Sequence, residues 1–323
     1  MMFWRDGWRA RVQRAAAVAV AVLLLASCGG GEHVRTFVAG RVLSFGDETS
    51  VMEAGGIKYS VNFIPAVSDT NPTPTIDCTQ FPIWIQPVAL AYGVPFPQCP
   101  SGLASTPSRI LAAPGARVAD VGVQINTFLA SDAFAANDLV TMLAGTNDMF
   151  ALYQQMQTGG LSSDQAVAAA EQAGTDMAGQ VNRIAALGAK VLISTIPDES
   201  FSPDGRSDVN KAAALHLLTQ RFNAKLRTGL LNDGRMIGLV LFDESVQAMV
   251  NNTAAFETAT PQCNDATLDD VRTCTSNTLR VLADGVTVAT PGTWLWADRT
   301  HIGPIGHSTL GSLAANRAAN NPF

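Results

Sequence analysis

The sequence is poor in charge, and it lacks several features that point to common functions. Charged residues make up 15% of the 323 residues, and the formal net charge is −6. Beyond the N-terminal arginines there is no run of Lys or Arg, so nucleic acid is not expected as a partner. No Cys-x-x-Cys pair occurs, which argues against a zinc site of that kind. No internal repeat is visible.

The N-terminus has the organisation of an export signal. Ala15–Ala26 is an apolar run, too short to span a bilayer comfortably, and it follows a group of arginines: Arg5, Arg9, Arg11 and Arg14. The run ends in Leu-Ala-Ser-Cys, which resembles the bacterial lipobox; the alternative is an ordinary signal peptide with a chance cysteine. We predict a signal peptide at residues 1–27, a lipidated Cys28 and a tether over 28–36. The expected location is the bacterial cell envelope, at the periplasmic side or surface of the outer membrane.

Four cysteines remain after Cys28, and an exported chain meets an oxidising compartment. Four cysteines allow three pairings. The local pairing, Cys78 with Cys99 and Cys263 with Cys274, is predicted because each pair lies within one loop-like region rich in Pro, Asn or Thr. A metal site is the competing interpretation.

Apolar strands alternate with amphipathic helices along the rest of the chain. The predicted strands are unbroken apolar runs, as in strands buried on both faces: Arg41–Phe45, Leu139–Leu143, Val191–Ile196 and Ile237–Phe242. One predicted helix begins at a capping box that starts with Ser162 and ends at Gly188. The alternation predicts a single α/β domain over residues 37–323, a three-layer sandwich with a central, mainly parallel sheet.

The region between the first two predicted strands is expected to be mostly irregular. Met52–Phe63 has the pattern of a hairpin turning at Gly55-Gly56. Residues 65–114 are rich in Pro, Thr and Ser, and they predict an ordered loop with one short helix around Ile83–Tyr92.

Three polar segments are candidates for a site, because sites in open α/β sheets gather at the carboxyl ends of the strands. The first is Gly46-Asp47-Glu48, a tight turn directly after a strand. In the second, Gly145-Thr146-Asn147-Asp148, the Asn amide can donate to a developing negative charge, although a plain β-turn has the same composition. In the third, Asp298-Arg299-Thr300-His301, the aspartate can orient the imidazole as a general base; a surface Asp and His is the alternative.

These three segments, in this order, resemble the blocks of the SGNH, or GDSL, hydrolase family, in particular its lecithinase/hemolysin-like branch. The resemblance runs from about Arg41 to Leu313. It includes further short segments: Gly56-x-Lys58-Tyr59-x-Val61-Asn62, Pro82-Ile83-Trp84, Asn137-Asp138-Leu139-Val140, Pro197-Asp198, Leu218-Thr219-x-x-Phe222-Asn223 and Pro304-x-Gly306-His307. It implies a sheet of flavodoxin-like topology and hydrolysis of a carboxylic ester through an acyl-enzyme, without metal or cofactor.

The resemblance also implies a role for each matching position. His301 is expected to be the general base, and Asp298 is expected to orient it. Asn147 is expected to donate to the oxyanion from its side chain and Gly115 from its backbone N–H. The backbone N–H at position 48 is the remaining donor.

Glu48 departs from the family, which has a serine nucleophile at this position. Four interpretations stay open. Ser50 can substitute as nucleophile, or Thr49 can do so less well. Glu48 can act as base or nucleophile in different chemistry. Alternatively, the chain is a catalytically impaired pseudoenzyme that binds an acylated ligand in the same cleft. The expected ligand is an ester-bearing lipid or glycan, and the expected oligomeric state is a monomer.

Overall fold

The computed structural model describes residues 37–99, 107–231 and 234–320. The signal peptide, the lipidated Cys28 and the tether therefore lie outside the described residues. Phe37–Phe323 forms one compact unit. Within the described part of the chain, no helix is both long enough and apolar enough to cross a membrane.

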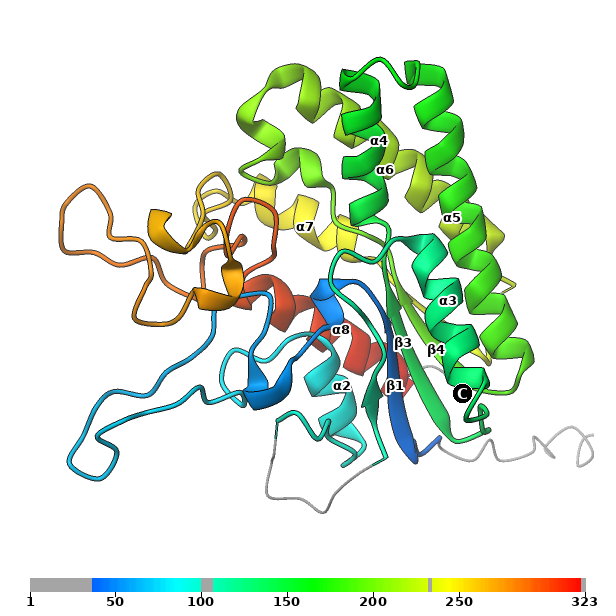
Figure 1. The fold of residues 1–323 in the computed structure, drawn as a ribbon, viewed down its shortest axis with the longest axis horizontal. Helices are drawn as coiled ribbons and strands as arrows, with labels where there is room; N and C mark the ends of the chain where they lie inside the picture. Colours follow the sequence, from blue (N-terminus) through cyan, green and yellow to red (C-terminus); the bar gives the residue numbers. More distant parts are fainter. Residues whose placement is uncertain (1–36, 100–106, 232–233, 321–323) are drawn as a thin grey trace, which may run out of the picture. The chain divides into compact units, whose positions relative to one another are not determined.

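A five-stranded, all-parallel sheet forms the centre of the molecule, in the order β2-β1-β3-β4-β5 (Figure 1). The strands are β1 Arg41–Gly46, β2 Arg109–Ile110, β3 Asp138–Leu143, β4 Lys190–Ser194 and β5 Ile237–Val240. All six residues of β3 are buried, as expected for a strand covered on both faces. The strand order is that of flavodoxin-like sheets, which confirms the predicted fold class.

Helices cover both faces of the sheet (Figure 1). One layer consists of α3 Val118–Leu129, α4 Thr146–Gln157, α5 Ser163–Ala186 and α6 Val209–Gly229; the other consists of α2 Ile85–Ala91, α7 Phe242–Asn251 and α8 Pro304–Asn320. Alternation along β3 divides the core between them. Val140 and Met142 pack into the first layer, and Leu139 and Leu143 pack into the second.

Local signals set the ends of the helices near the site. Ser162 and Gln165 form the predicted capping box at the start of α5. Gly188, just after this helix, has φ +99°, a conformation that favours glycine. At the start of α6, the Asp208 side chain accepts hydrogen bonds from two backbone N–H groups.

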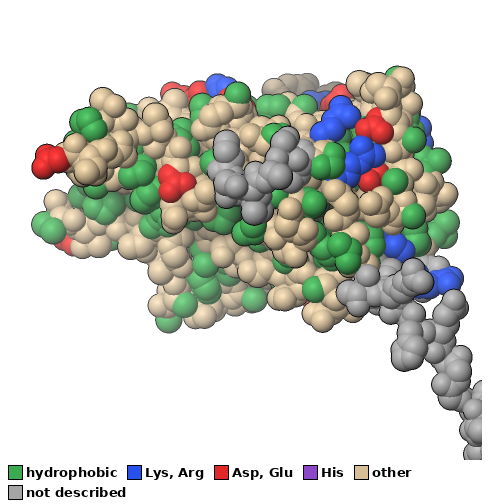
Figure 2. Space-filling model, turned by 90° about the horizontal axis from the view of Figure 1, so that it is seen from below, with side chains coloured by type: hydrophobic (Ala, Val, Ile, Leu, Met, Phe, Trp, Pro, Cys, Tyr) green, Lys and Arg blue, Asp and Glu red, His purple; other side chains and the backbone are tan. Residues whose placement is uncertain are grey.

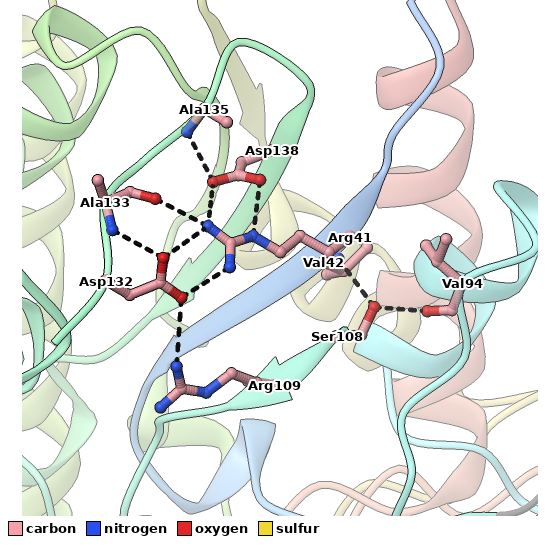
Figure 3. Close-up of polar contacts among 9 residues, drawn as sticks. All are labelled: Arg41, Val42, Val94, Ser108, Arg109, Asp132, Ala133, Ala135 and Asp138. Atoms are coloured by element: carbon pink, nitrogen blue, oxygen red, sulfur yellow. Dashed lines mark hydrogen bonds and ion pairs between the residues drawn. The ribbon is translucent and has the colours of Figure 1, made fainter. Parts of the chain in front are cut away.

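A charged network joins the strands at the end of the sheet opposite the candidate site (Figure 3). The Arg41 guanidinium contacts Asp138 at 2.8 Å and Asp132 at 2.7 Å, and Arg109 contacts Asp132 at 3.5 Å. The Ser108 hydroxyl accepts from the backbone N–H of β1 at Val42. These bonds link β1, β2 and β3, so we interpret the network as structural.

Figure 2 shows the molecule from below the view of Figure 1. Basic side chains on this face lie among acidic ones, and apolar side chains are scattered between polar ones. This face therefore has no broad basic surface of the kind that attracts nucleic acid.

Three details of the sequence prediction are wrong. Met52–Phe63 forms no regular hairpin: a single bridge joins Met52 to Lys58, and Ala54–Gly56 is a short 3-10 turn. The ladder does not continue because the Lys58 backbone N–H donates to Asn62 Oδ1 at 2.9 Å, while the Lys58 ammonium turns inward and donates to the Gln80 carbonyl at 2.7 Å. Phe242 starts α7 instead of ending a strand. Finally, the region expected to be a loop contains β2, whose two residues are too few for a periodic pattern.

Two disulfides stabilise the irregular regions outside the sheet. Cys78 is joined to Cys99, and Cys263 to Cys274, which is the local pairing expected from the sequence. Cys263 and Cys274 belong to a small apolar cluster separate from the two main cores. Each bridge is worth about 2–4 kcal/mol of stability, mainly by restricting the unfolded chain.

Candidate active site

The three predicted polar segments meet at the carboxyl edge of the sheet. Glu48 directly follows the turn after β1, and Asn147 lies in the first turn of α4, which follows β3. β1 and β3 are neighbours, and the chain runs outward in opposite directions from this pair. Ligands of open α/β sheets bind at such a switch point. His301 comes from the loop before α8 and reaches the same place.

Close packing of backbone fixes the turn that presents Glu48. Gly46 has φ +135°, and a Cβ there would lie 1.9 Å from the carbonyl oxygen of Leu143, so only glycine fits. The Asp47 carboxylate then accepts a hydrogen bond from Thr49 N at 3.0 Å. The glycine and the cap together start a short 3-10 turn at Glu48, which directs this side chain to the neighbouring β3–α4 connection.

A second glycine fixes the position of Asn147. Gly145 has φ +134°, and a Cβ there would lie 2.5 Å from the ring of Phe222. One residue beyond Asn147, the Asp148 carboxylate accepts from Val118 N at 3.0 Å and so joins the start of α4 to the start of α3. The loop before α3 contains Gly115. The bond between the two helix starts therefore explains how Gly115 and Asn147, which are far apart in sequence, direct their N–H groups to the same point.

The Glu48 carboxylate occupies the point where these donors converge. Gly115 N donates to its Oε2 at 2.8 Å, and Asn147 Nδ2 donates to Oε2 at 3.0 Å and to Oε1 at 3.2 Å. His301 Nε2 lies 3.8 Å from Glu48 Oε1. The two groups expected to stabilise an oxyanion are therefore both bonded to a carboxylate of the chain itself.

His301 lies between two carboxylates. Its Nδ1 is 2.8 Å from Asp298 Oδ2, while Asp298 Oδ1 accepts from the backbone N–H groups of Thr300 and His301. Burial lowers the pKa of His301, but the hydrogen bond with Asp298 and the charges of Asp298, Glu48 and Asp47 outweigh it, so the net pKa is raised. Burial raises the pKa of Asp298, yet its bonds to His301 lower it overall. The pair therefore favours an imidazolium beside a carboxylate.

Asp47 is a further carboxyl beside this pair, and it is 1% exposed. Burial raises its pKa well above the usual value, and the charge of Glu48 adds to the effect. Its Oδ2 has no hydrogen-bond partner among the described residues.

The structure contradicts the interpretation that Ser50 replaces the missing nucleophile. Ser50 is fully buried, and its Oγ accepts a hydrogen bond from the indole N–H of Trp84 at 3.0 Å. The 3-10 turn over Glu48–Ser50 directs Ser50 into the core, so a shift of two residues places its hydroxyl away from His301. Thr49, in contrast, lines the same hollow as Glu48 and His301.

Two cavities adjoin His301. One is a hollow of about 130 Å³, whose walls include Glu48, Asn147, Glu199 and His301. The other is an open groove of about 520 Å³ lined mainly by polar and charged side chains: Tyr59, Asp204, Asp269, Asp270, Arg272, Asp298, Arg299, Thr300 and His301. The Tyr59 ring centroid is 6.1 Å from that of His301. Among the described residues, no group of three or more His, Cys, Asp or Glu side chains is arranged to hold a metal ion.

Comparison with known proteins assigns a family to the chain. A family model described as GDSL-like Lipase/Acylhydrolase matches residues 101–313. The chain belongs to this family. No sequence among the curated proteins matches it. The matched segment contains Gly115, Asn147, Asp298 and His301, whereas Glu48 precedes it.

Several solved structures are similar to this family member at low sequence identity. A lipolytic G-D-S-L protein from Veillonella parvula is 11% identical, with a TM-score of 0.41, 85% of this chain covered and 96% of the other. Axe2, an acetylxylan esterase from Geobacillus stearothermophilus, is 12% identical, with a TM-score of 0.44, 90% of this chain covered and 98% of the other. LAE5, an alpha/beta hydrolase from the metagenome of Lake Arreo, Spain, is 15% identical, with a TM-score of 0.41, 87% of this chain covered and 96% of the other.

Sequence reasoning missed one residue of the site. Glu199 lies in a short 3-10 turn that follows β4, directly after the Pro197-Asp198 pair, and it lines the hollow with His301. Its position after a strand of the sheet was a signal available in the sequence, but nothing there indicated that a charged side chain would point inward and be 1% exposed.

Proposed function

We propose that this member of the GDSL-like lipase/acylhydrolase family binds an ester-bearing ligand at the His301 cleft without serine-type turnover. The observation that supports the proposal is the Glu48 carboxylate, which accepts hydrogen bonds from Gly115 N and Asn147 Nδ2 and faces His301 Nε2. An acyl-transfer enzyme keeps these donors free for the negative charge that develops in the transition state.

The physical cost to acyl transfer is large. Loss of one oxyanion donor typically costs about 10²–10³-fold in rate, and here two donors are bonded to an anion that repels the developing charge. The raised pKa of His301 works in the same direction, because a protonated imidazole cannot accept the proton of a nucleophile.

A second candidate function is slow ester hydrolysis with the Thr49 hydroxyl as nucleophile. Thr49 is favoured over Ser50 because it lines the hollow that His301 and Asn147 share. In this alternative the Glu48 side chain has to leave the donors before an ester carbonyl can enter.

We also propose the nature of the ligand and the location of the protein. The groove beside His301 is large enough for a sugar-sized group, and its charged lining fits a polar glycan better than an acyl tail.

We propose a monomer held at the bacterial cell envelope by lipid on Cys28, where acylated glycans and lipids are both accessible.

The test combines fluorophosphonate labelling with hydrolysis of p-nitrophenyl acetate. We expect the wild-type protein to remain unlabelled and inactive. Glu48→Ser should become labelled and gain activity by at least about 10²-fold, the scale of one restored oxyanion donor. The double variant Glu48→Ser/His301→Ala should lose that gain, which controls for chance reactivity of a surface serine.

Other outcomes separate the two candidates. Wild-type labelling that disappears in Thr49→Val would refute the binding proposal in favour of the hydrolase. Glu48→Ser that folds but remains unreactive would show that the other site residues no longer support acyl transfer.

A further inference from the structure

Glu199 is a buried carboxyl in the wall of the hollow, and the roles assigned above do not use it. It is 1% exposed and lines the hollow with Glu48, Asn147 and His301. Its Oε2 is shielded from solvent and has no hydrogen-bond partner among the described residues. A buried polar atom without a partner costs about 1–3 kcal/mol. Glu199 also lines the hollow, so its carboxyl group is a candidate to contact a ligand bound there.

The backbone holds Glu199 in this position. The Asp198 carboxylate accepts from Ser200 N at 3.0 Å, and the Glu199 carbonyl accepts from Ser202 Oγ at 2.8 Å. A Cβ at Gly205 would lie 1.8 Å from that same carbonyl, so the neighbouring turn packs directly on it. These contacts fix the backbone of Glu199 beside the hollow.

The environment of Glu199 favours its neutral form. Burial raises its pKa well above the usual value; a hydrogen bond with Ser202 opposes this, and the negative charges of Asp198, Asp298 and Asp204 add to it. The charged groups with the largest effect on it are all acidic. A protonated carboxyl has an O–H that can donate, whereas a carboxylate can only accept.

We propose that Glu199 donates a hydrogen bond to an oxygen of the ester bound in the hollow, and is thus a specificity-determining residue. The inference rests on the proposed function, because it requires an ester in this cleft. An uncharged ester oxygen is a good acceptor for this O–H. A carboxylate ligand is disfavoured because the Glu48 carboxylate lines the same hollow, and an apolar group leaves the donor unpaired.

The first test measures protonation directly by infrared spectroscopy at pH 7. The wild-type spectrum should contain a carbonyl band of protonated Glu199 that is lost in Glu199→Gln, and phenyl acetate should shift this band. Asp47 provides the matched control: it is also buried with an unpaired oxygen, but it does not line the hollow. In the wild-type spectrum, the carbonyl band of Asp47 is identified by its loss in Asp47→Asn. This band should therefore not shift when phenyl acetate is added to the wild-type protein. Absence of the Glu199 band would refute the proposal.

The NMR signal of the His301 ring, followed in the same titration, separates the two proposals. If phenyl acetate shifts the His301 signal but not the Glu199 band, the role of Glu199 is refuted and the cleft is retained. If it changes neither, the ester-binding function itself fails, and the role of Glu199 fails with it.

A kinetic test uses the Glu48→Ser background. Glu199→Gln retains a donor, whereas Glu199→Leu has similar size and none. We expect the Leu variant to raise KM for p-nitrophenyl acetate about tenfold at nearly constant kcat, since one hydrogen bond is worth about 1.4 kcal/mol. The Gln variant should stay within about threefold. A purely structural role predicts equal KM values for both variants and a lower unfolding midpoint instead.

Discussion

Replacing Glu48 with Gln tests the electrostatics of the site without changing its shape. The variant retains a side-chain oxygen for Gly115 N and Asn147 Nδ2 but removes the negative charge that lies 3.8 Å from His301 Nε2. That charge contributes to the raised pKa of His301. The pKa of His301 should therefore fall.

The distance gives the size of the change. Two unit charges at 3.8 Å interact by about 1 kcal/mol in water and by about 4 kcal/mol at an effective dielectric of about 20. With about 1.4 kcal/mol per pKa unit, these limits correspond to roughly 0.8 and 3 units. The His301 side chain is 25% exposed, which places the site between them. We expect a fall of about 1–2 units.

NMR titration of the imidazole measures this pKa in the folded protein. Asp164→Asn is the matched control, since it removes one negative charge at the exposed start of α5 and should leave the pKa of His301 unchanged. A shift under about 0.3 units in Glu48→Gln would refute the reasoning, because it lies below even the fully aqueous limit.

The free energy of unfolding should change with pH as His301 titrates. A raised pKa in the folded state stabilises the protein below the unfolded-state value of about 6.5, and this stabilisation is lost as pH rises through the folded value. The wild-type protein should therefore lose more stability than Glu48→Gln across that window. Urea unfolding at a series of pH values checks the sign.

Three further predictions follow from the packing. Ser50→Ala should leave the activity gained by Glu48→Ser intact and should cost about 1–2 kcal/mol in urea unfolding, because Trp84 loses its buried acceptor. Gly46→Ala should cost more than about 3 kcal/mol or prevent folding, because its Cβ overlaps a backbone carbonyl of β3; circular dichroism and solubility test this. The Cys263→Ser/Cys274→Ser double variant should lose about 2–4 kcal/mol in urea unfolding, and wild type treated with reductant should lose about twice as much, because the reductant also opens Cys78–Cys99.

Much of the fold could be predicted because short-range patterns determine it. Apolar runs such as that of β3 require burial on both faces, and their alternation with amphipathic helices leads to a parallel sheet. The capping box at Ser162 fixed the start of a helix for a purely local reason. Lys58 shows the limit: its inward turn depends on carbonyls some twenty residues further along the chain, which no local pattern reveals.

The candidate site, too, could be predicted from the sequence only in part. Local motifs indicated Asp298, His301 and Asn147 as candidates, while the family resemblance added Gly115 and a role for each residue. It also determined that Glu48 stands where a nucleophile is expected. It could not determine where the Glu48 carboxylate points, because that depends on two backbone turns and a neighbouring loop.

Tertiary structure decided what these residues can do together. It placed the Glu48 carboxylate on the two donors that the resemblance assigns to an oxyanion, buried Ser50 against Trp84, and brought Glu199 to the wall of the hollow. The physical reason is that hydrogen bonding and burial act between segments far apart in the sequence, such as those of Glu48 and His301. The amino-acid sequence therefore determined the fold and indicated which residues form the site. Only the tertiary structure determined which interactions these residues can make.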